Sequence, residues 1–197
     1  MPHLLASDYP NTDQHETSVR DRRSSRANGG TIHTSIVAGP SRGEHRMRTF
    51  ESVAELAAAK GQTIGRSNWV TITQQEVNLF ADATGDHQWI HVDPDRAAKG
   101  PFGTTIAHGF MTLSLLPRLL HEIYEVKGIK LAINYGLNKV RFPAPVPVGS
   151  KIRAQSSLVD VADVGDGAVQ ATLSTTIEIE GAAKPACVAE SIVRYVS

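Results

Sequence analysis

The sequence lacks the features that identify several large classes of protein. Its 197 residues contain one cysteine, Cys187, which excludes an internal disulfide framework and favours a reducing compartment. Lysine plus arginine equal aspartate plus glutamate, at 20 each, so the composition carries no electrostatic signature of nucleic-acid or anionic-membrane binding. No stretch approaches the roughly 18 apolar residues of a membrane-spanning helix, and residues 1–30 lack the basic-then-apolar order of a secretory signal. We expect a cytoplasmic protein with no nucleic-acid or membrane partner.

Several familiar catalytic and binding motifs are missing as well. The chain has no GxSxG, no P-loop GK(S/T), no CxxC and no complete GxGxxG, which removes the commonest hydrolase, nucleotide-binding and zinc-ribbon interpretations. It also has no internal repeat that we detect. A chain of this length is expected to bury one well-filled core.

The first 46 residues differ in composition from the rest of the chain. They are rich in Ser, Arg, Asn, Gly and His and poor in hydrophobic residues, so they cannot bury enough apolar surface to offset the entropy of ordering. We expect residues 1–46 to be a disordered N-terminal extension and residues 47–197 to form a single domain. A version that begins at Met47 should therefore fold and keep its activity.

Helical patterns precede a run of strand patterns in residues 47–197. A short amphipathic helix is predicted over 49–60 and a strand over 67–73. Thr73 and Glu76 form a T-x-x-E capping box ahead of a second helix that should stop at Gly85. Residues rich in Asp, Pro and Gly then indicate a structured loop over 86–104.

The longest helix pattern runs over residues 105–126 and is apolar around most of its circumference. Such helices are buried, and this one should kink at Pro117. Alternating patterns predict four strands after it, at 131–142, 151–161, 168–180 and 185–196, the last with Cys187 in the core. The order predicts an α+β fold in which an antiparallel sheet wraps around a long central helix.

Asp86 and His91 are the strongest candidates for chemistry. They are five residues apart, so they can face one cleft only if the loop folds back, which Trp89 and Ile90 would allow by anchoring it in the core. A carboxylate beside an imidazole suits general acid-base work on a water molecule. The alternative is that Asp86 caps a turn after Gly85 and His91 is an ordinary, partly buried histidine.

Two further possibilities involve neighbouring residues. His87, His91, Asp93 and His108 are all possible metal ligands, but the HxxxH lies on an irregular loop with no cysteine nearby, so we expect no metal. Gly109, after His108 at the start of the apolar pattern, would let an oxyanion approach unpaired backbone N–H groups. Gly109 would equally be explained by tight packing against the sheet.

Taken together, these residues resemble the motif of the MaoC-like (R)-specific enoyl-CoA hydratases, which have the hotdog fold. The matching segments read GDHQWIHVD, from Gly85 to Asp93, and IAHGFM, from Ile106 to Met111, and VRFPAPVPVG, from Val140, is similar to the strand and turn downstream. The resemblance covers residues 47–197 and is close to mycobacterial single-hotdog members. Gln88 and Trp89 depart from the Asn-Pro that is usual in the family.

The resemblance implies a mechanism and a set of site residues. Asp86 and His91 would hold the water that adds to C3 of a trans-2-enoyl thioester, and the Gly109 N–H would meet the developing oxyanion. The product is an (R)-3-hydroxyacyl thioester, and the reverse dehydration is equally available. Substrate contacts are expected from Gln88, Trp89, His108 and Arg141.

The resemblance also implies partners and leaves alternatives. Coenzyme A or an acyl carrier is the handle of the substrate, no cofactor or metal is required, and a homodimer is expected. The first alternative is a hotdog acyl-CoA thioesterase, and the second is a noncatalytic hotdog subunit of a heteromeric dehydratase. The set of Asp86, His91 and the His108–Gly109 pair argues against the first, and the intact Asp86 and His91 disfavour the second.

Overall fold

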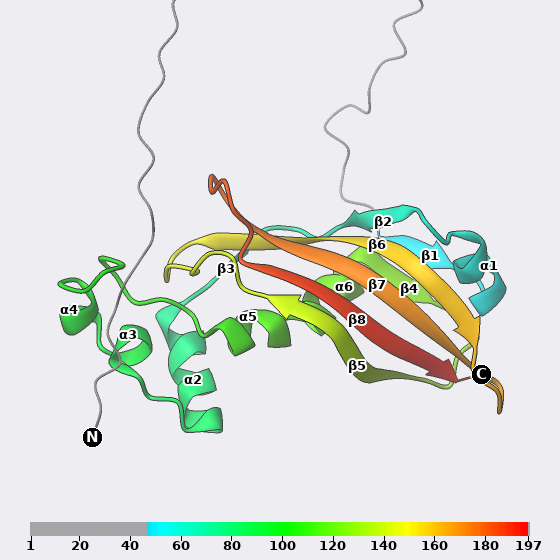
Figure 1. Ribbon diagram of the computed structural model, residues 1–197, viewed down its shortest axis with the longest axis horizontal. Coiled ribbons are helices and arrows are strands. Elements are labelled where there is room, and N and C mark those ends of the chain that lie inside the picture. Colours follow the sequence, from blue (N-terminus) through cyan, green and yellow to red (C-terminus); the bar gives the residue numbers. More distant parts are fainter. Residues whose placement is uncertain (1–46, 197) are drawn as a thin grey trace, which may run out of the picture. The chain divides into compact units, whose positions relative to one another are not determined.

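Four long strands form the centre of the fold in the computed structural model, which describes residues 47–196. They are β5 (Leu131–Arg141), β6 (Lys151–Asp163), β7 (Ala168–Ile179) and β8 (Cys187–Val196), each within two residues of its predicted bounds. The sheet runs β2-β6-β7-β8-β5 with antiparallel pairing, and β2 (Thr63–Arg66) and β3 (Val70–Thr71) both pair with β6 (Figure 1). The predicted disorder of residues 1–46 lies outside the described residues.

Two helices pack against this sheet. Figure 1 shows α5 (Gly109–Ser114) and α6 (Leu116–Ile123) beneath the long strands. The buried face of α6 consists of Leu116, Leu119, Leu120 and Ile123, and these pack in one core with the inward residues of β6, β7 and β8. Cys187 is buried in that core, as predicted, and burial raises its thiol pKa to about 11. The α+β architecture with a sheet around a helical core is confirmed.

The single helix predicted over 105–126 is wrong in its bounds and continuity. Residues before Gly109 are extended, because the Ala107 N–H donates to the Val146 carbonyl. The helix then breaks at Leu115 rather than kinking at Pro117, since proline has no N–H to continue the ladder and is tolerated in the first turn of α6. Phe110 is 70% exposed, so the pattern is not buried all round.

The beginning of the described chain also differs from its prediction. Residues 48–50 form a short strand, β1 (Arg48–Phe50), which pairs in parallel with β4 (Tyr124–Val126). Helix α1 (Val53–Ala58) starts only after Ser52, whose hydroxyl accepts the Glu55 N–H as an N-cap. The strand predicted over 67–73 is present only as the two residues of β3.

The second helix and the segment after it carry the candidate residues. Helix α2 (Gln74–Thr84) has the predicted capping box and the predicted end at Gly85. The predicted loop contains two single-turn helices, α3 (Trp89–Val92) and α4 (Pro94–Ala97). Figure 1 shows α2, α3 and α4 gathered at one end of the sheet, next to the start of α5. None of the helices in residues 47–196 has the length and apolar character needed to cross a bilayer.

Candidate active site

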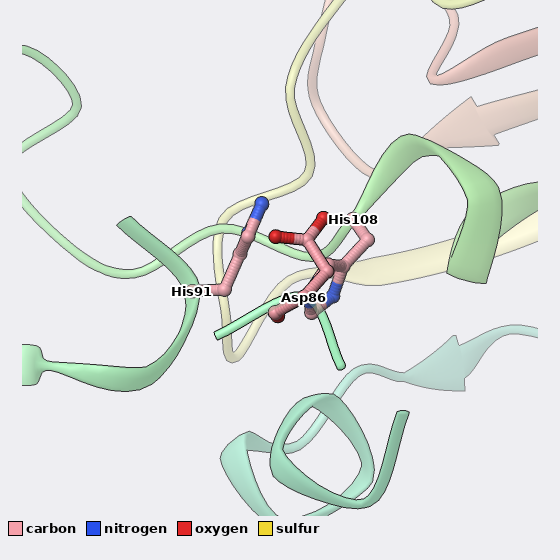
Figure 2. A group of neighbouring side chains, drawn as sticks. All are labelled: Asp86, His91 and His108. Carbon is pink, nitrogen blue, oxygen red and sulfur yellow. The ribbon is translucent and has the colours of Figure 1, made fainter. Parts of the chain in front are cut away.

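Three separate segments bring Asp86, His91 and His108 together. Asp86 follows α2, His91 lies on α3, and His108 immediately precedes α5, and Figure 2 shows their side chains next to one another. One potential ligand atom from each residue lies within 4.8 Å of those of the other two. The loop therefore folds back so that Asp86 and His91 share one cluster.

The end of α2 positions Asp86. Gly85 adopts a left-handed conformation, with φ of 77°, and its N–H donates to the Ala81 carbonyl at 2.8 Å. Glycine is favoured there because a side chain would be strained at this φ. The chain turns sharply after it and leaves the Asp86 side chain exposed, with a long contact of 3.4 Å from the Gln88 N–H to Oδ1. The carboxylate is thus free to bind another group.

His91 is held in one orientation and one tautomer. Its residue is only 6% exposed, and its ring Nδ1 lies 2.7 Å from the Ile106 carbonyl oxygen. Because a carbonyl only accepts hydrogen bonds, Nδ1 must carry the proton and the Nε2 lone pair is available. Burial lowers the pKa of His91, and the neighbouring His108 adds to this, while the Ile106 carbonyl and Asp86 oppose it. The imidazole is suited to accept a proton near neutral pH.

His108 contacts both Asp86 and His91. Its Nε2 lies 2.9 Å from the backbone carbonyl of Asp86, to which it must donate, and its ring stacks on His91 with centroids 3.7 Å apart and planes 26° apart. Phe80 contacts the ring as well, at 5.1 Å between centroids. The remaining nitrogen, Nδ1, is buried and has no hydrogen-bond partner within residues 47–196.

Gln74 and Thr105 join the two sides of the cluster and were not predicted from the sequence. The Gln74 amide nitrogen donates to the His91 backbone carbonyl at 2.7 Å and to Asn78 Oδ1 at 2.8 Å. The buried Thr105 hydroxyl donates to the Gln74 side-chain oxygen. Gln74 thus connects α3 to the segment leading into α5. In the sequence it is an ordinary first-turn helix residue, so no local signal marks it.

Close packing explains why residue 109 is glycine, apart from any role of its backbone N–H. A Cβ on Gly109 would lie 3.1 to 3.3 Å from ring atoms of Phe142, closer than normal contact. As the first residue of α5 it has no intrahelical acceptor for its N–H. Tight packing therefore accounts for glycine at position 109. Because the residue is the first of α5, its N–H is also available as a donor.

Of the other residues expected to contact substrate, Gln88 and Trp89 lie between Asp86 and His91, and Arg141 is the last residue of β5. Gln88 is exposed before α3, and Trp89 is half-buried with the Arg96 guanidinium 4.5 Å above its ring. A Cβ on Gly100 would lie 2.9 Å from the Trp89 ring, so Trp89 anchors this loop. Arg141 is exposed and donates to the neighbouring Val140 carbonyl.

Two of the four residues considered as metal ligands lie outside the cluster. His87 forms an exposed ion pair with Asp82 at 2.9 Å, which raises its pKa. Asp93 caps α4 by accepting the Arg96 N–H at 3.0 Å. The donors that come together are Asp86, His91 and His108.

Comparison with known proteins decides the family. The family model described as MaoC like domain matches residues 55–179, well over half of the chain. The chain belongs to the MaoC-like family. The resemblance to MaoC-like hydratases is therefore confirmed.

Individual MaoC-like relatives agree with this assignment. The chain is 81% identical over 151 residues to 3-hydroxyacyl-thioester dehydratase Z of Mycobacterium tuberculosis, covering 77% of this chain and all of the relative. It is 43% identical over 143 residues to Nodulation protein N of Rhizobium leguminosarum, covering 72% of this chain and 89% of the relative. Among solved structures, the (R)-hydratase from A. caviae involved in PHA biosynthesis superimposes with a TM-score of 0.56 at 28% identity, covering 67% of this chain and 95% of that one. The predicted hotdog fold is confirmed.

Proposed function

We propose that this chain catalyses the reversible dehydration of (R)-3-hydroxyacyl thioesters, with enoyl-CoA as the substrate of the hydration direction. The prediction of a hydro-lyase is confirmed by the family and by the dehydratase to which the chain is 81% identical. The observation that carries the finer proposal is the exposed Asp86 carboxylate beside a buried imidazole whose Nε2 lone pair is free.

The Asp86–His91 pair supplies the acid-base chemistry. A water held between the carboxylate and Nε2 attacks C3 of the enoyl thioester and loses one proton to the pair. The pair delivers one proton to C2, so it ends each turnover in the protonation state in which it began. The lowered pKa of His91 keeps the imidazole neutral and ready to accept the proton.

The Gly109 N–H stabilises the negative charge that develops on the thioester oxygen. Preorganised donors of this kind typically contribute about 3–4 kcal/mol to the transition state. Helix α5 is only six residues long, so the support comes from one unpaired N–H rather than from the dipole of a long helix.

An apolar cavity along the helices that follow Gly109 suits an acyl chain. A cavity of about 390 Å³ lies between α5, α6 and strands β5 and β8. Its lining includes Leu113, Leu116, Leu120 and Val193. The thioester handle, coenzyme A or an acyl carrier, is part of the substrate, and the acid-base chemistry proposed here calls for no further cofactor.

The edge strand β5 supports the proposal of a homodimer. It ends the sheet, and Leu131, Ile133, Tyr135 and Leu137 on it are 45% to 54% exposed. A long apolar edge strand is a template for pairing with another chain unless it is covered. A second copy of this chain would cover it. The cytoplasmic location stays a prediction.

Crotonyl-CoA separates this proposal from its alternatives. Loss of enoyl absorbance with formation of the (R)-3-hydroxy product is the expected result. Release of free thiol without hydration would instead identify a thioesterase. Inertness of the purified chain, relieved only by a second hotdog protein, would identify a noncatalytic subunit.

A further inference from the structure

His108 has almost no surface to offer a substrate. The residue is only 3% exposed, and its ring packs against the rings of His91 and Phe80. The resemblance to the family led us to expect a substrate contact from this side chain. A side chain buried to this extent acts instead on the residues that surround it.

The hydrogen bond from His108 is the shortest that Asp86 makes within the described part of the chain. His108 Nε2 lies 2.9 Å from the Asp86 carbonyl oxygen. The Asp86 N–H lies 3.4 Å from the Thr84 hydroxyl, and the Gln88 N–H lies 3.4 Å from the Asp86 carboxylate. Because hydrogen bonds beyond the usual range of about 2.7–3.2 Å are weak, His108 is the main side-chain contact that holds the backbone of Asp86.

The same imidazole also holds the ring of His91. The hydrogen bond from His91 Nδ1 to the Ile106 carbonyl fixes one edge of that ring, but a single bond lets the ring tilt about it. The His108 ring lies against it, with centroids 3.7 Å apart and planes 26° apart. Stacking at this distance restricts the tilt and so fixes the direction of the Nε2 lone pair.

The backbone of His108 is fixed at the start of α5. Its carbonyl oxygen accepts the Thr112 N–H at 3.1 Å and the Thr112 hydroxyl at 3.3 Å. The next residue is Gly109, the proposed oxyanion donor. One residue therefore connects Asp86, His91 and the oxyanion donor, which lie on three separate segments.

The stacked imidazoles also interact electrostatically. Two positive charges at this separation repel each other, so His108 disfavours a charged His91. Burial lowers the pKa of His91 most and His108 lowers it further, whereas the Ile106 carbonyl and the Asp86 carboxylate raise it. Asp86 and His108 are the titratable groups that act on His91 within the described residues. Removal of His108 therefore removes one of the two influences that keep His91 uncharged.

We propose that His108 is a positioning residue, whose Nε2–H holds the backbone of Asp86 and whose ring holds that of His91, so that both groups face one water. It also keeps His91 in the uncharged form that accepts a proton. The catalytic consequence rests on the proposed function of the Asp86–His91 pair, whereas the effect on the titration of His91 does not.

Two substitutions separate the hydrogen bond from the stacking. His108→Phe keeps an aromatic ring beside His91 but removes the donor to Asp86. His108→Gln keeps an N–H donor at a similar reach but removes the ring. Displacement of a reacting group by about 1 Å can cost roughly 100-fold in rate, so kcat for crotonyl-CoA hydration should fall by about 10- to 100-fold in His108→Phe and by less in His108→Gln. KM should change little in both variants, because the buried ring does not face the substrate.

The titration of His91 is measured independently of activity. In isotope-labelled full-length protein, the ring nitrogen signals of His91 are followed by NMR across the pH range. Both variants should raise the pKa of His91, and the acid limb of the kcat/KM profile should move to higher pH with it. His87→Gln is the matched control, because it removes an exposed imidazole that pairs with Asp82 and should leave kcat and the His91 titration unchanged.

The outcomes separate a positioning role from a structural one and from substrate binding. A lower kcat with little change in KM, together with a higher pKa of His91, supports the proposal. A lower melting temperature with unchanged kcat and an unchanged His91 titration would make His108 merely structural and overturn it. A raised KM with unchanged kcat would assign His108 to substrate binding and also overturn it. If His108→Phe does not fold, His108→Gln decides by the same criteria.

Failure of the proposed function gives a different result. Wild-type protein that does not hydrate crotonyl-CoA contradicts the proposed function. The NMR titration still tests whether His108 keeps His91 uncharged, and an unchanged pKa of His91 in both variants would overturn that effect.

Discussion

Replacing Gln74 by alanine tests whether a side chain outside the Asp86–His91 pair positions the catalytic histidine. Gln74 bonds to the His91 carbonyl, to Asn78 and to the buried Thr105 hydroxyl. Asn78 is exposed and regains water in the variant, but the Thr105 hydroxyl and the His91 carbonyl lose partners in a partly or fully buried region. Unsatisfied buried groups cost about 1–3 kcal/mol each, so the loss of two partners by Gln74→Ala should lower the free energy of unfolding by roughly 2–6 kcal/mol.

The kinetic effect follows from the position of His91. Displacement of a reacting group by about 1 Å can cost roughly 100-fold in rate, so kcat for crotonyl-CoA hydration should fall by about 10- to 100-fold. KM should change little, because Gln74 is not placed to touch the substrate. The matched control is Gln75→Ala, an exposed residue of the same helical turn. Chemical denaturation and steady-state kinetics on both variants give the comparison.

A double-mutant cycle sharpens the same test. Thr105→Val removes the hydroxyl that Gln74 accepts from, so Gln74→Ala and Thr105→Val should be non-additive by about 0.5–3 kcal/mol. If Gln74→Ala behaves like Gln75→Ala in both stability and kcat, the hydrogen bonds of Gln74 do not position His91, and this part of the account is wrong.

Three further predictions concern the pair, the oxyanion donor and the edge strand. Burial lowers the pKa of His91, so kcat/KM should fall on acidification only below the ordinary histidine pKa of about 6.5. An inflection above that value in the pH profile of kcat/KM would contradict the neutral imidazole. Gly109→Ala should destabilise the protein by about 1–3 kcal/mol, because the new methyl group overlaps the Phe142 ring. Adding Phe142→Leu to the Gly109→Ala variant should restore much of the melting temperature. An unchanged melting temperature for Gly109→Ala alone would exclude the overlap. Ile133→Lys on β5 should give a monomer by analytical ultracentrifugation. Val159→Lys, at a similarly exposed position of β6, should remain a dimer. A dimer in both cases would place the interface elsewhere.

The strands could be predicted because their side chains obey a simple alternation. In β8 buried and partly exposed residues alternate along its whole length, and β7 is nearly as regular, so period-2 patterning located both within two residues. The three-residue strands β1 and β4 left no such signal, since their parallel pairing depends on residues 76 positions apart. Short elements of this kind are decided by tertiary contacts rather than by local sequence.

The interrupted helix illustrates a limit of hydrophobic patterning. The pattern of residues 105–126 continues through Pro117, but the helical hydrogen-bond ladder does not. The extended backbone before Gly109 is fixed by hydrogen bonds to the backbone of residues 146–148. Apolar residues recur at helical spacing whether they belong to one helix or to two that bury the same face. Patterning therefore predicted the burial of this segment better than its continuity.

The candidate site was predictable where residues form a local motif and not where they meet only in the fold. Asp86, His91 and Gly109 stand in two short segments whose spacing resembles that of the family. The stacking of His108 on His91 and the Gln74 hydrogen bonds join segments 17 or more residues apart. Spacing within one segment says nothing about such contacts, so they required the structure.

The central claim is that Asp86 and His91 act together on a water molecule. The most direct measurement is the rate of crotonyl-CoA hydration by Asp86→Asn and His91→Gln, beside their melting temperatures. Loss of a positioned acid-base group typically costs on the order of 10²- to 10⁴-fold, and we expect such losses in kcat with nearly unchanged melting temperatures. A near-normal rate in either folded variant would contradict the mechanism.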